Sequence, residues 1–468
     1  MMKSLKRMTT EQILRSISGF LGRASDRDFE YLLSVMERLA TSYREKTILQ
    51  TLRDGWRSNS PLAQLIRRVF RETNPECRYR FLYNLFFNQS FGEAKVKRDA
   101  YTERYGYRPP WAMLISPTMR CNLRCAGCYA GEYTRKDDLP AEVIDRVLTE
   151  GEEMGISFVT ILGGEPFIRD DLWPIYEKHR DTLFQIYTNG TLLDEEAAKR
   201  IARLGNIVPA VSIEGFEEET DGRRGKGTFQ TIMRAMDALR QNGIIFGFSA
   251  MVTRYNVDTI ISDDFNRMLV EKGAYIGWHF LYMPVGRDPD LSLMPTPEQR
   301  DLLRRMGAAR IRAAYPMFVM DFWNDAPYVG GCIAAGRDYF HITSRGDVEP
   351  CIFTHFAVDN IKEKSLKEVL ESPYFRGIRA RQPYSENLLR PCMLIDHPHV
   401  FREIYQTYHP YPTHPGAETL VGELAAGLDR YAQEAAPILE EAWRKDFIEG
   451  GINIFPEEAP HKEPAAAA

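Results

Sequence analysis

Three cysteines lie close together in the segment Cys121-Asn-Leu-Arg-Cys125-Ala-Gly-Cys128-Tyr129. Thiolates at this spacing suit one 4Fe–4S cluster, which usually takes four cysteine ligands. The next cysteine downstream is Cys332, so one iron would stay open to a ligand that is not protein. The alternatives are a structural zinc site or three buried thiols. Zinc is disfavoured because it needs a fourth ligand and the nearest histidine is His179.

Polar motifs follow several predicted strands at the points where those strands end. Ligands bind at the carboxyl ends of parallel strands, and glycine lets a backbone come close to a ligand. These motifs therefore predict one ligand site next to the cysteine segment. They are Gly163-Gly164-Glu165-Pro166, Thr188-Asn189-Gly190-Thr191, Ser212-Ile213-Glu214-Gly215 and Asp221-Gly-Arg-Arg224-Gly225.

A second group of cysteines, Cys332, Cys351 and Cys392, follows much later in the chain. Three cysteines predict one further cluster, whose fourth ligand must come from another residue or from substrate. A zinc ion held by the three cysteines and one histidine is chemically sound as well. Four side chains lie near enough in sequence to be the fourth ligand: Asp338, His341, Asp396 and His397.

The elements that must position these residues alternate regularly between strand and helix from residue 112 to about residue 283. Short apolar runs, each followed by a helical pattern, predict six strand–helix units with right-handed crossovers. Six units cannot close like the eight of a full barrel, so we expect an open, partial (β/α)6 barrel of the α/β class. The expected strands are Ala112–Ser116, Ile156–Leu162, Phe184–Thr188, Ile207–Ile213, Ile244–Val252 and Tyr275–Met283.

The regions before and after the predicted barrel lack this strand–helix alternation. Residues 1–108 show helical spacing and predict a helical N-terminal domain, in which the aromatic segment 80–87 forms core or, alternatively, a surface for an apolar substrate. We expect the barrel over 109–320, an auxiliary-cluster domain over 321–400, and a C-terminal helical extension with a disordered tail over 401–468. The segment 321–325 is expected to be a loop packed by its aromatic rings, with its acids in water.

Composition narrows the class of protein. The chain has 468 residues, 44 % of them hydrophobic and 27 % charged, with a net charge of −5, which gives no electrostatic case for nucleic acid as a partner. Residues 1–12 lack the apolar run of a signal peptide, and the longest apolar stretch, 243–252, is too short to span a membrane. Grouped cysteines favour a reducing interior. We expect a cytoplasmic protein of an anaerobe, because an open cluster is vulnerable to oxygen.

These motifs together resemble those of the radical S-adenosylmethionine (radical SAM) enzymes. The cysteine spacing with Tyr129 beside the last cysteine matches the motif of that superfamily, and Gly163–Pro166 resembles its GGEP motif. The resemblance implies that S-adenosylmethionine chelates the open iron through its methionine part. Glu165 or the Gly164 carbonyl would then accept from the ammonium group.

Two further elements extend the resemblance. Ser212–Gly215 is similar to a Ser-x-Asp-Gly element, with Glu214 replacing the usual aspartate, and Asp221–Gly225 is similar to Asp-x-x-Arg-Gly. Arg224 is the expected partner of the methionine carboxylate, and Thr188 and Asn189 would reach ribose or carboxylate. A solvated surface arginine is the alternative for Arg224.

The second cysteine group resembles the first half of the SPASM/twitch extension that follows many radical SAM barrels. The full SPASM pattern has about seven cysteines and two clusters, so with three cysteines we expect a single auxiliary 4Fe–4S cluster. The implied enzyme is an oxidoreductase that cleaves S-adenosylmethionine reductively to a 5′-deoxyadenosyl radical, which takes a hydrogen atom from substrate.

The partners implied are a reductant protein such as flavodoxin or ferredoxin and a substrate that is a peptide, a lipid or a small molecule. Peptide substrates of SPASM-type enzymes are usually delivered by a winged-helix domain, so a helical N-terminal region weakens that default. The competing function is a non-catalytic iron–sulfur electron carrier or scaffold, which would need fully ligated clusters and no adenosyl site.

Overall fold

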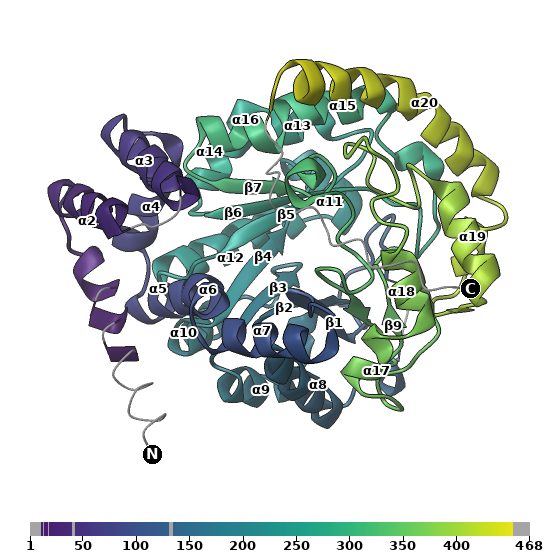
Figure 1. The fold of residues 1–468 in the computed structure, drawn as a ribbon, viewed down its shortest axis with the longest axis horizontal. Helices are drawn as coiled ribbons and strands as arrows, with labels where there is room; N and C mark the ends of the chain where they lie inside the picture. The colour runs from purple at the N-terminus through teal and green to yellow at the C-terminus, as the bar shows by residue number, and fades with distance from the viewer. Residues whose placement is uncertain (1–10, 13, 17, 40–42, 131–133, 453–468) are drawn as a thin grey trace.

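A computed structural model describes residues 11–452, apart from 13, 17, 40–42 and 131–133. Its centre is a mostly parallel sheet wrapped by helices (Figure 1). The strand order is β7-β6-β5-β4-β3-β2-β1-β8-β9, so the two edges, β7 and β9, are not paired with each other. The partial, open barrel expected from the sequence is thereby confirmed.

The six predicted strand–helix units all form. Each strand is a short, buried, apolar run, and helices cover its outer face: Val147 and Leu148 of α8, for example, pack in one core with Val159 and Ile161 of β2. The strands are β1 (Ala112–Thr118), β2 (Phe158–Gly163), β3 (Leu183–Thr188), β4 (Ile207–Ser212), β5 (Gly247–Val252) and β6 (Ile276–Leu281). The helices between and after them are α8 (Ala141–Met154), α9 (Trp173–Lys178), α10 (Glu195–Leu204), α11 (Glu217–Arg224), α12 (Thr228–Gln241), α13 (Val257–Ile261), α14 (Asp263–Glu271), α15 (Pro297–Met306) and α16 (Ala308–Ala314).

Three further strands lengthen the sheet. β7 (Phe318–Asp321) runs parallel to β6, while β8 (His341–Ile342) adds to the free edge of β1 and pairs in turn with β9 (Val348–Glu349). The segment 321–325 corrects part of an expectation, because one of its two acids is buried and the other, which is partly exposed, is held in an ion pair. Asp321 is 1 % exposed and accepts hydrogen bonds from the backbone of Trp323 and Asn324, and Asp325 pairs with Arg312.

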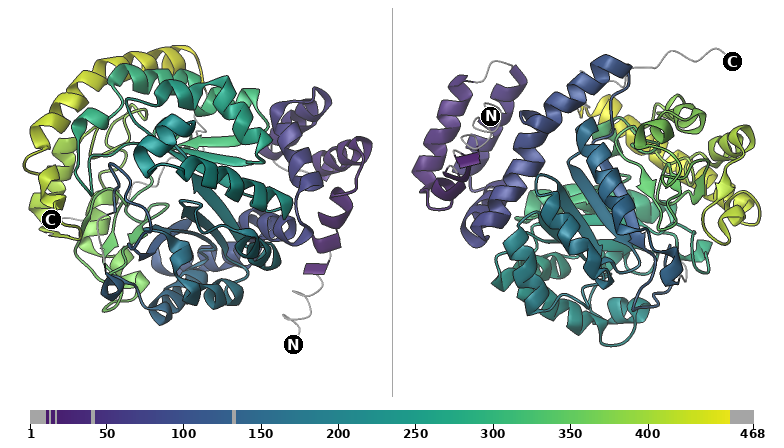
Figure 2. Two further views of the ribbon diagram at one scale, coloured as in Figure 1. Left: turned by 180° about the vertical axis from the view of Figure 1, so that it is seen from behind. Right: turned by 90° about the horizontal axis from the view of Figure 1, so that it is seen from below.

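The described residues before β1 are helical, as predicted. Their helices lie on one side of the sheet and the C-terminal segments lie on the other (Figure 2). The elements are α2 (Asp26–Leu39), α3 (Tyr43–Arg57), α4 (Pro61–Glu72), α5 (Pro75–Phe81), the π-helical turn η1 (Leu82–Phe87), α6 (Asn88–Ser90) and α7 (Glu93–Tyr105).

These N-terminal helices close the barrel at the amino ends of its strands. Leu65, Val69, Phe81 and Leu85 pack against a small core made of strand starts and the residues before them: Leu183, Val208, Ile245 and Tyr275. The aromatic segment 80–87 therefore contributes to a core at the end of the barrel remote from the cysteine segment. That face of a barrel serves stability rather than ligand binding.

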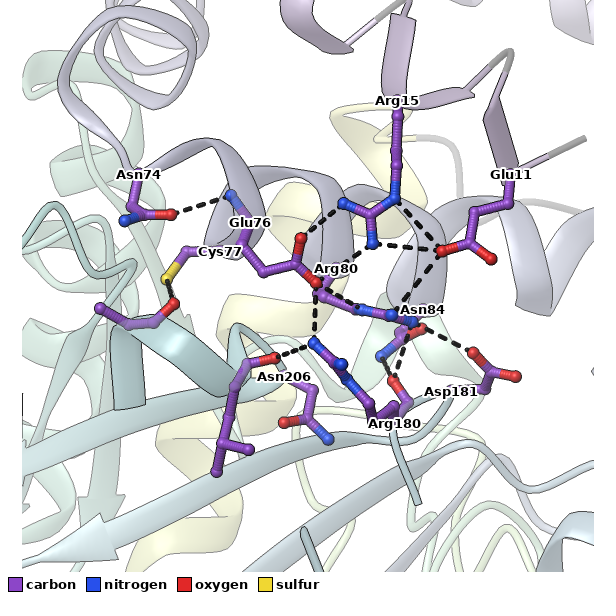
Figure 3. Close-up of polar contacts among 12 residues, drawn as sticks. Glu11, Arg15, Asn74, Glu76, Cys77, Arg80, Asn84, Arg180, Asp181 and Asn206 are labelled. Carbon is purple, nitrogen blue, oxygen red and sulfur yellow. Dashed lines mark hydrogen bonds and ion pairs between the residues drawn. The ribbon is translucent and has the colours of Figure 1, made fainter. Parts of the chain in front are cut away.

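A network of charged side chains fixes the same junction (Figure 3). Glu76 of α5 accepts hydrogen bonds from Arg15 at 2.5 Å, Arg80 at 3.0 Å and Arg180 at 3.0 Å, and Arg180 lies in the loop before β3. Arg80 also pairs with Asp181. Burial disfavours the Glu76 carboxylate, but the hydrogen bonds and charges of Arg15 and Arg80 outweigh burial and lower its pKa.

We predict that Glu76→Gln lowers the free energy of unfolding by about 2 kcal/mol. Breaking a fully buried ion pair costs about 3–5 kcal/mol, and Glu76 is 22 % exposed, so the effect is smaller. Because the folded pKa lies below the unfolded one, this stabilisation is present above the unfolded pKa and is lost as pH falls through the folded pKa. Urea unfolding at pH 7 and at pH 3 measures both effects. The control is Glu93→Gln, because Glu93 is exposed on α7. An equal decrease in the free energy of unfolding in this control would contradict the account.

The C-terminal part begins with the segment carrying the second cysteine group and ends in a long helix that packs on α15 and α19, where Tyr431 donates to the Pro295 carbonyl. Its elements are η6 (Ala326–Val329), β10 (Phe356–Ala357), α17 (Leu366–Leu370), α18 (Pro373–Arg379), α19 (Pro398–Tyr408), β11 (Tyr411–Pro412), η7 (Ala417–Leu420), α20 (Ala425–Trp443) and the π-helical turn η8 (Arg444–Glu449). The predicted disordered tail, 453–468, lies outside the described residues. In the described chain no helix combines the length and apolarity needed to cross a bilayer.

Candidate functional site: two cysteine loops at the strand ends

The first cysteine loop leaves the carboxyl end of β1 and is tied to helix α11 and to the segment after β6. The Ala126 N–H donates to the Arg223 carbonyl of α11 at 3.0 Å, and the Arg287 N–H, after β6, donates to the Cys128 carbonyl at 2.9 Å. Cys121 is exposed, Cys125 buried and Cys128 partly buried. Backbone contacts from two distant segments thus hold one loop with three free thiols.

The surroundings of these thiols fit an iron–sulfur cluster. Cys121 Sγ accepts from the Leu123 N–H at 3.4 Å and from Asn189 Nδ2 at 3.6 Å, while Arg224 Nη1 lies 4.0 Å from Cys125 Sγ. Hydrogen bonds and positive charge at the sulfurs stabilise the negative charge of a thiolate-bound cluster. Among the described residues no three His, Cys, Asp or Glu side chains converge tightly enough to hold a single metal ion. A cluster binds each thiolate to a different iron.

The GGEP segment lies directly against this loop. Gly163 ends β2 with φ of +112°, and its N–H donates to the Tyr129 hydroxyl at 3.0 Å. A Cβ on Gly164 would come within 2.0 Å of the Arg120 carbonyl oxygen, so only glycine allows this approach. The two glycines and Tyr129 thereby join the end of β2 to the cysteine loop.

Glu165 faces the protein interior rather than a ligand. It is fully buried, and its carboxylate accepts from the Thr188 hydroxyl at 2.9 Å, the Asn189 N–H at 2.8 Å and the Phe167 N–H at 3.1 Å. Burial raises the pKa of Glu165 to about 7, although these hydrogen bonds lower it in part. Of the two expected acceptors for an ammonium group, this arrangement favours the Gly164 carbonyl and makes Glu165 a brace between β2 and β3. Pro166 follows as the first residue of the 3-10 turn η3 (Pro166–Ile168).

Polar side chains follow β3 and end β4, and only those that follow β3 contact the loop in the described structure. Asn189 Nδ2 donates to Asn122 Oδ1 at 2.8 Å, in addition to its contact with Cys121. Ser212 Oγ at the end of β4 lies 3.1 Å from Ser249 Oγ of β5. Ser249 was not singled out from the sequence, because it lies inside an apolar strand with no neighbouring motif.

Glu214 and two arginines form a buried charged group. Arg224 makes two contacts with the Glu214 carboxylate, at 2.5 and 2.6 Å, and Arg223 makes one at 2.9 Å. Glu214 is 1 % exposed; burial disfavours its charge, but the charges of Arg224 and Arg223 outweigh burial and lower its pKa. Arg224 is therefore not a solvated surface residue. The edge of its guanidinium that was expected to bind a ligand carboxylate faces Glu214 instead.

The second cysteine group also comes together, from three separate loops. Cys332 precedes β8, Cys351 follows β9, and Cys392 lies before α19; all three are partly buried. Backbone N–H groups two residues further on, those of Ala334, Phe353 and Leu394, hydrogen-bond the three sulfurs, as Leu123 does at Cys121. This repeated pattern fits thiolate ligands of a cluster.

The four expected candidates for a fourth ligand all have protein partners. His341 contacts Ser116 Oγ at 2.7 Å and Glu349 Oε2 at 2.6 Å with its two ring nitrogens. The remaining partners are Arg300 at 2.7 Å for Asp396, the Arg390 carbonyl at 2.9 Å for His397, and Arg337 at 3.6 Å for Asp338. None of the four is therefore singled out as the fourth ligand by the described contacts.

Comparison with known proteins identifies the class. Residues 115–263 match the Radical SAM superfamily, and residues 332–393 match the SPASM iron–sulfur cluster-binding domain. The chain thus carries a radical SAM domain followed by a SPASM-type domain. Its cofactors are S-adenosylmethionine, the 4Fe–4S cluster that binds it, and an auxiliary iron–sulfur cluster. It is an enzyme of this radical chemistry rather than a non-catalytic electron carrier.

The individual relatives share less than 30 % of their aligned residues with this chain. Mycofactocin maturase MftC of Mycolicibacterium smegmatis is 29 % identical over 61 % of this chain and 76 % of that protein. Fe-coproporphyrin III synthase of Methanosarcina barkeri is 29 % identical over 45 % of this chain and 56 % of that protein. Streptococcus suis SuiB bound to S-adenosylmethionine shares the fold, with a TM-score of 0.53 and 18 % identity over 71 % of this chain and 87 % of SuiB; it has also been solved with its precursor peptide SuiA.

Proposed function

We propose that Cys121, Cys125 and Cys128 hold the cluster that binds S-adenosylmethionine, and that the strand ends around them position its methionine and adenosyl parts. When bound, these groups supply reductive cleavage of the sulfonium and a 5′-deoxyadenosyl radical that takes a hydrogen atom from substrate. The residues assigned to S-adenosylmethionine are Gly163, Gly164, Thr188, Asn189 and Ser212, supported by Glu165, Pro166, Glu214 and Arg224. The single observation that carries this assignment is that the ends of β2 and β3, the end of α11 and the segment after β6 all contact one three-thiol loop.

The role that we assign to the Arg224–Glu214 pair is to hold a positive charge beside the first cysteine loop. Arg224 lies between a buried carboxylate and the Cys125 sulfur, so its charge stabilises both. A methionine carboxylate would be bound by the remaining Nη1 edge, or would replace Glu214 as the bidentate partner. Either arrangement keeps the guanidinium beside the cluster.

We infer that the substrate presents an aromatic or conjugated ring. Five aromatic side chains from β3, β6, the segment after β7 and the segment before β8 form a connected set of rings that we call the ring set: Tyr187, Trp278, Phe280, Phe322 and Tyr339. Trp278 and Phe280 stack at 5.7 Å, and Phe280 lies 5.9 Å from Tyr187 and 6.1 Å from Phe322. Phe322 meets Tyr339 edge to face at 5.7 Å.

The ring set joins the two cysteine groups. Tyr187 immediately precedes Thr188 and Asn189, beside Cys121, and Tyr339 contacts Cys351. Aromatic rings prefer to pack on other rings, in stacked or edge-to-face geometry. Similarity to an Fe-coproporphyrin III synthase supports a conjugated small molecule, and an aromatic peptide side chain is the alternative. The helical N-terminal region favours the small molecule, because it covers the end of the barrel opposite the first cysteine loop.

Phe280→Ala is predicted to weaken binding of the ring-bearing substrate about tenfold, equivalent to about 1.4 kcal/mol of lost ring contact. Two probes, iron coproporphyrin III and a tyrosine-containing peptide, are titrated separately while tryptophan fluorescence is followed. Phe318→Ala, at a 45 % exposed position on β7, is the control and keeps wild-type affinity. Binding of neither probe, or equal affinity of wild type and Phe280→Ala, would refute the ring-bearing substrate.

We further propose the setting in which the enzyme works. It takes electrons from a reductant protein such as flavodoxin or ferredoxin in the cytoplasm of an anaerobe. Residues 1–108 serve as the support of the barrel, 109–320 as the radical SAM barrel, 321–400 as the auxiliary-cluster domain, and 401–468 as a C-terminal extension. A copurifying or added ferredoxin that replaces dithionite in the cleavage assay supports the reductant proposal.

A further inference from the structure

The auxiliary thiols receive two kinds of hydrogen bond. One kind comes from the backbone, where the amides of Ala334, Phe353 and Leu394 donate to the sulfur two residues before each. Such bonds depend on the course of the chain and not on side-chain type. The other kind comes from side chains, and the one with defined geometry is the Tyr339 hydroxyl, which donates to Cys351 Sγ at 3.1 Å.

Tyr339 is buried, and burial strengthens its hydrogen bond to Cys351. The residue is 4 % exposed and packs in a small core with Ala112 and Ala334, against which Cys332 and Cys351 also pack. A hydrogen bond in such low-dielectric surroundings is electrostatically stronger than one in water. Its strength increases further when the acceptor carries a charge, as a metal-bound thiolate does.

The position of the hydroxyl is fixed by the loop that also carries Cys332. The N–H groups of Asp338 and Tyr339 both donate to the Ile333 carbonyl, at 3.0 and 3.1 Å, and the Asp338 carbonyl accepts from the N–H of Ala112 in β1 at 2.9 Å. The ring is held edge to face by Phe322. The donor is therefore set in place by β1, by the ring set and by the cysteine loop together.

We propose that Tyr339 sets the reduction potential of the auxiliary cluster through its hydrogen bond to Cys351. The inference rests on the proposed function, in that the three cysteines hold that cluster. Reduction adds one electron to the cluster and makes its sulfurs more negative. A donor aimed at a sulfur stabilises the reduced state more than the oxidised state, and so raises the potential.

Tyr339→Phe removes the hydroxyl and keeps the ring, so the cluster should persist with a more negative potential. Tyr374→Phe is the matched control, because Tyr374 is also fully buried and its hydroxyl has no hydrogen-bond partner in the described structure. Both changes are made in a Cys125→Ala background, so that the auxiliary cluster alone contributes to the signal. The measurement is an anaerobic redox titration followed by electron paramagnetic resonance, with iron counted and thermal unfolding recorded for each protein.

The expected result is about four irons in all three proteins, a negative shift of the midpoint potential in Tyr339→Phe, and no shift in Tyr374→Phe. An unchanged potential in Tyr339→Phe with the cluster intact overturns the inference and leaves the proposed function standing. Loss of iron in Tyr339→Phe with unchanged unfolding also overturns it, since Tyr339 would then be a ligand. Absence of iron in the Cys125→Ala parent would show that the second cysteine group holds no cluster; it overturns the inference and leaves the assignment of Cys121, Cys125 and Cys128 standing.

Discussion

Cys125→Ala is expected to reduce formation of 5′-deoxyadenosine to the background level while the barrel stays folded. Cys125 is the buried member of the triad, and the two remaining thiolates are too few to retain a cluster that leaves one iron for S-adenosylmethionine. The reconstituted protein is incubated without oxygen with S-adenosylmethionine and dithionite, and the nucleoside is measured by chromatography. Iron content should fall from about eight to about four per chain.

The matched control for this experiment is Cys77→Ala. Cys77 is a free, buried thiol at the opposite end of the barrel, where it contacts the Ala202 carbonyl (Figure 3). Its loss should leave both iron content and nucleoside formation at wild-type levels. Cleavage retained in Cys125→Ala, or lost equally in Cys77→Ala, would contradict the assignment of the triad.

The second large effect is expected on stability. Glu214→Ala leaves Arg223 and Arg224 without their shared carboxylate, and both are largely buried, with side chains 15 and 9 % exposed. Removing one partner of a buried ion pair costs about 3–5 kcal/mol, because an uncompensated charge remains. We expect a decrease of this size in the free energy of unfolding, measured with urea.

Glu217→Ala serves as the control, since Glu217 is an exposed acid on the neighbouring helix α11. It should change the free energy of unfolding by less than about 0.5 kcal/mol. The account of the buried charged group is wrong if Glu214→Ala is as stable as this control. Such a result would mean that the two arginines reach solvent when the carboxylate is removed.

The barrel could be predicted because its signals are local. Each parallel strand is a short apolar run, and residues such as Asp194 before α10 and Gly205 after it mark the helix ends. The S-adenosylmethionine motifs could be placed for the same reason, since each directly follows a strand. The fold class and the cofactors were read from these features, and the structure and the comparisons confirm them.

The rest depends on contacts between residues far apart in sequence, which leave no local pattern. β8 is only two residues long and exists because β1 offers it a free edge. Tyr339 has no motif of its own, and its bond to Cys351 follows from the packing of two loops. The sequence motif singles out Arg224, but the pairing of Arg224 with Glu214 follows from burial that the sequence does not display.

The central claim is that three cysteines leave one iron of the first cluster for S-adenosylmethionine to occupy. The most direct test is electron paramagnetic resonance of the reduced, oxygen-free protein, recorded before and after S-adenosylmethionine is added, with Cys351→Ala as the background to simplify the spectrum. We predict a clear change in the g values of the remaining cluster when the ligand binds. An identical spectrum with and without S-adenosylmethionine would contradict the account.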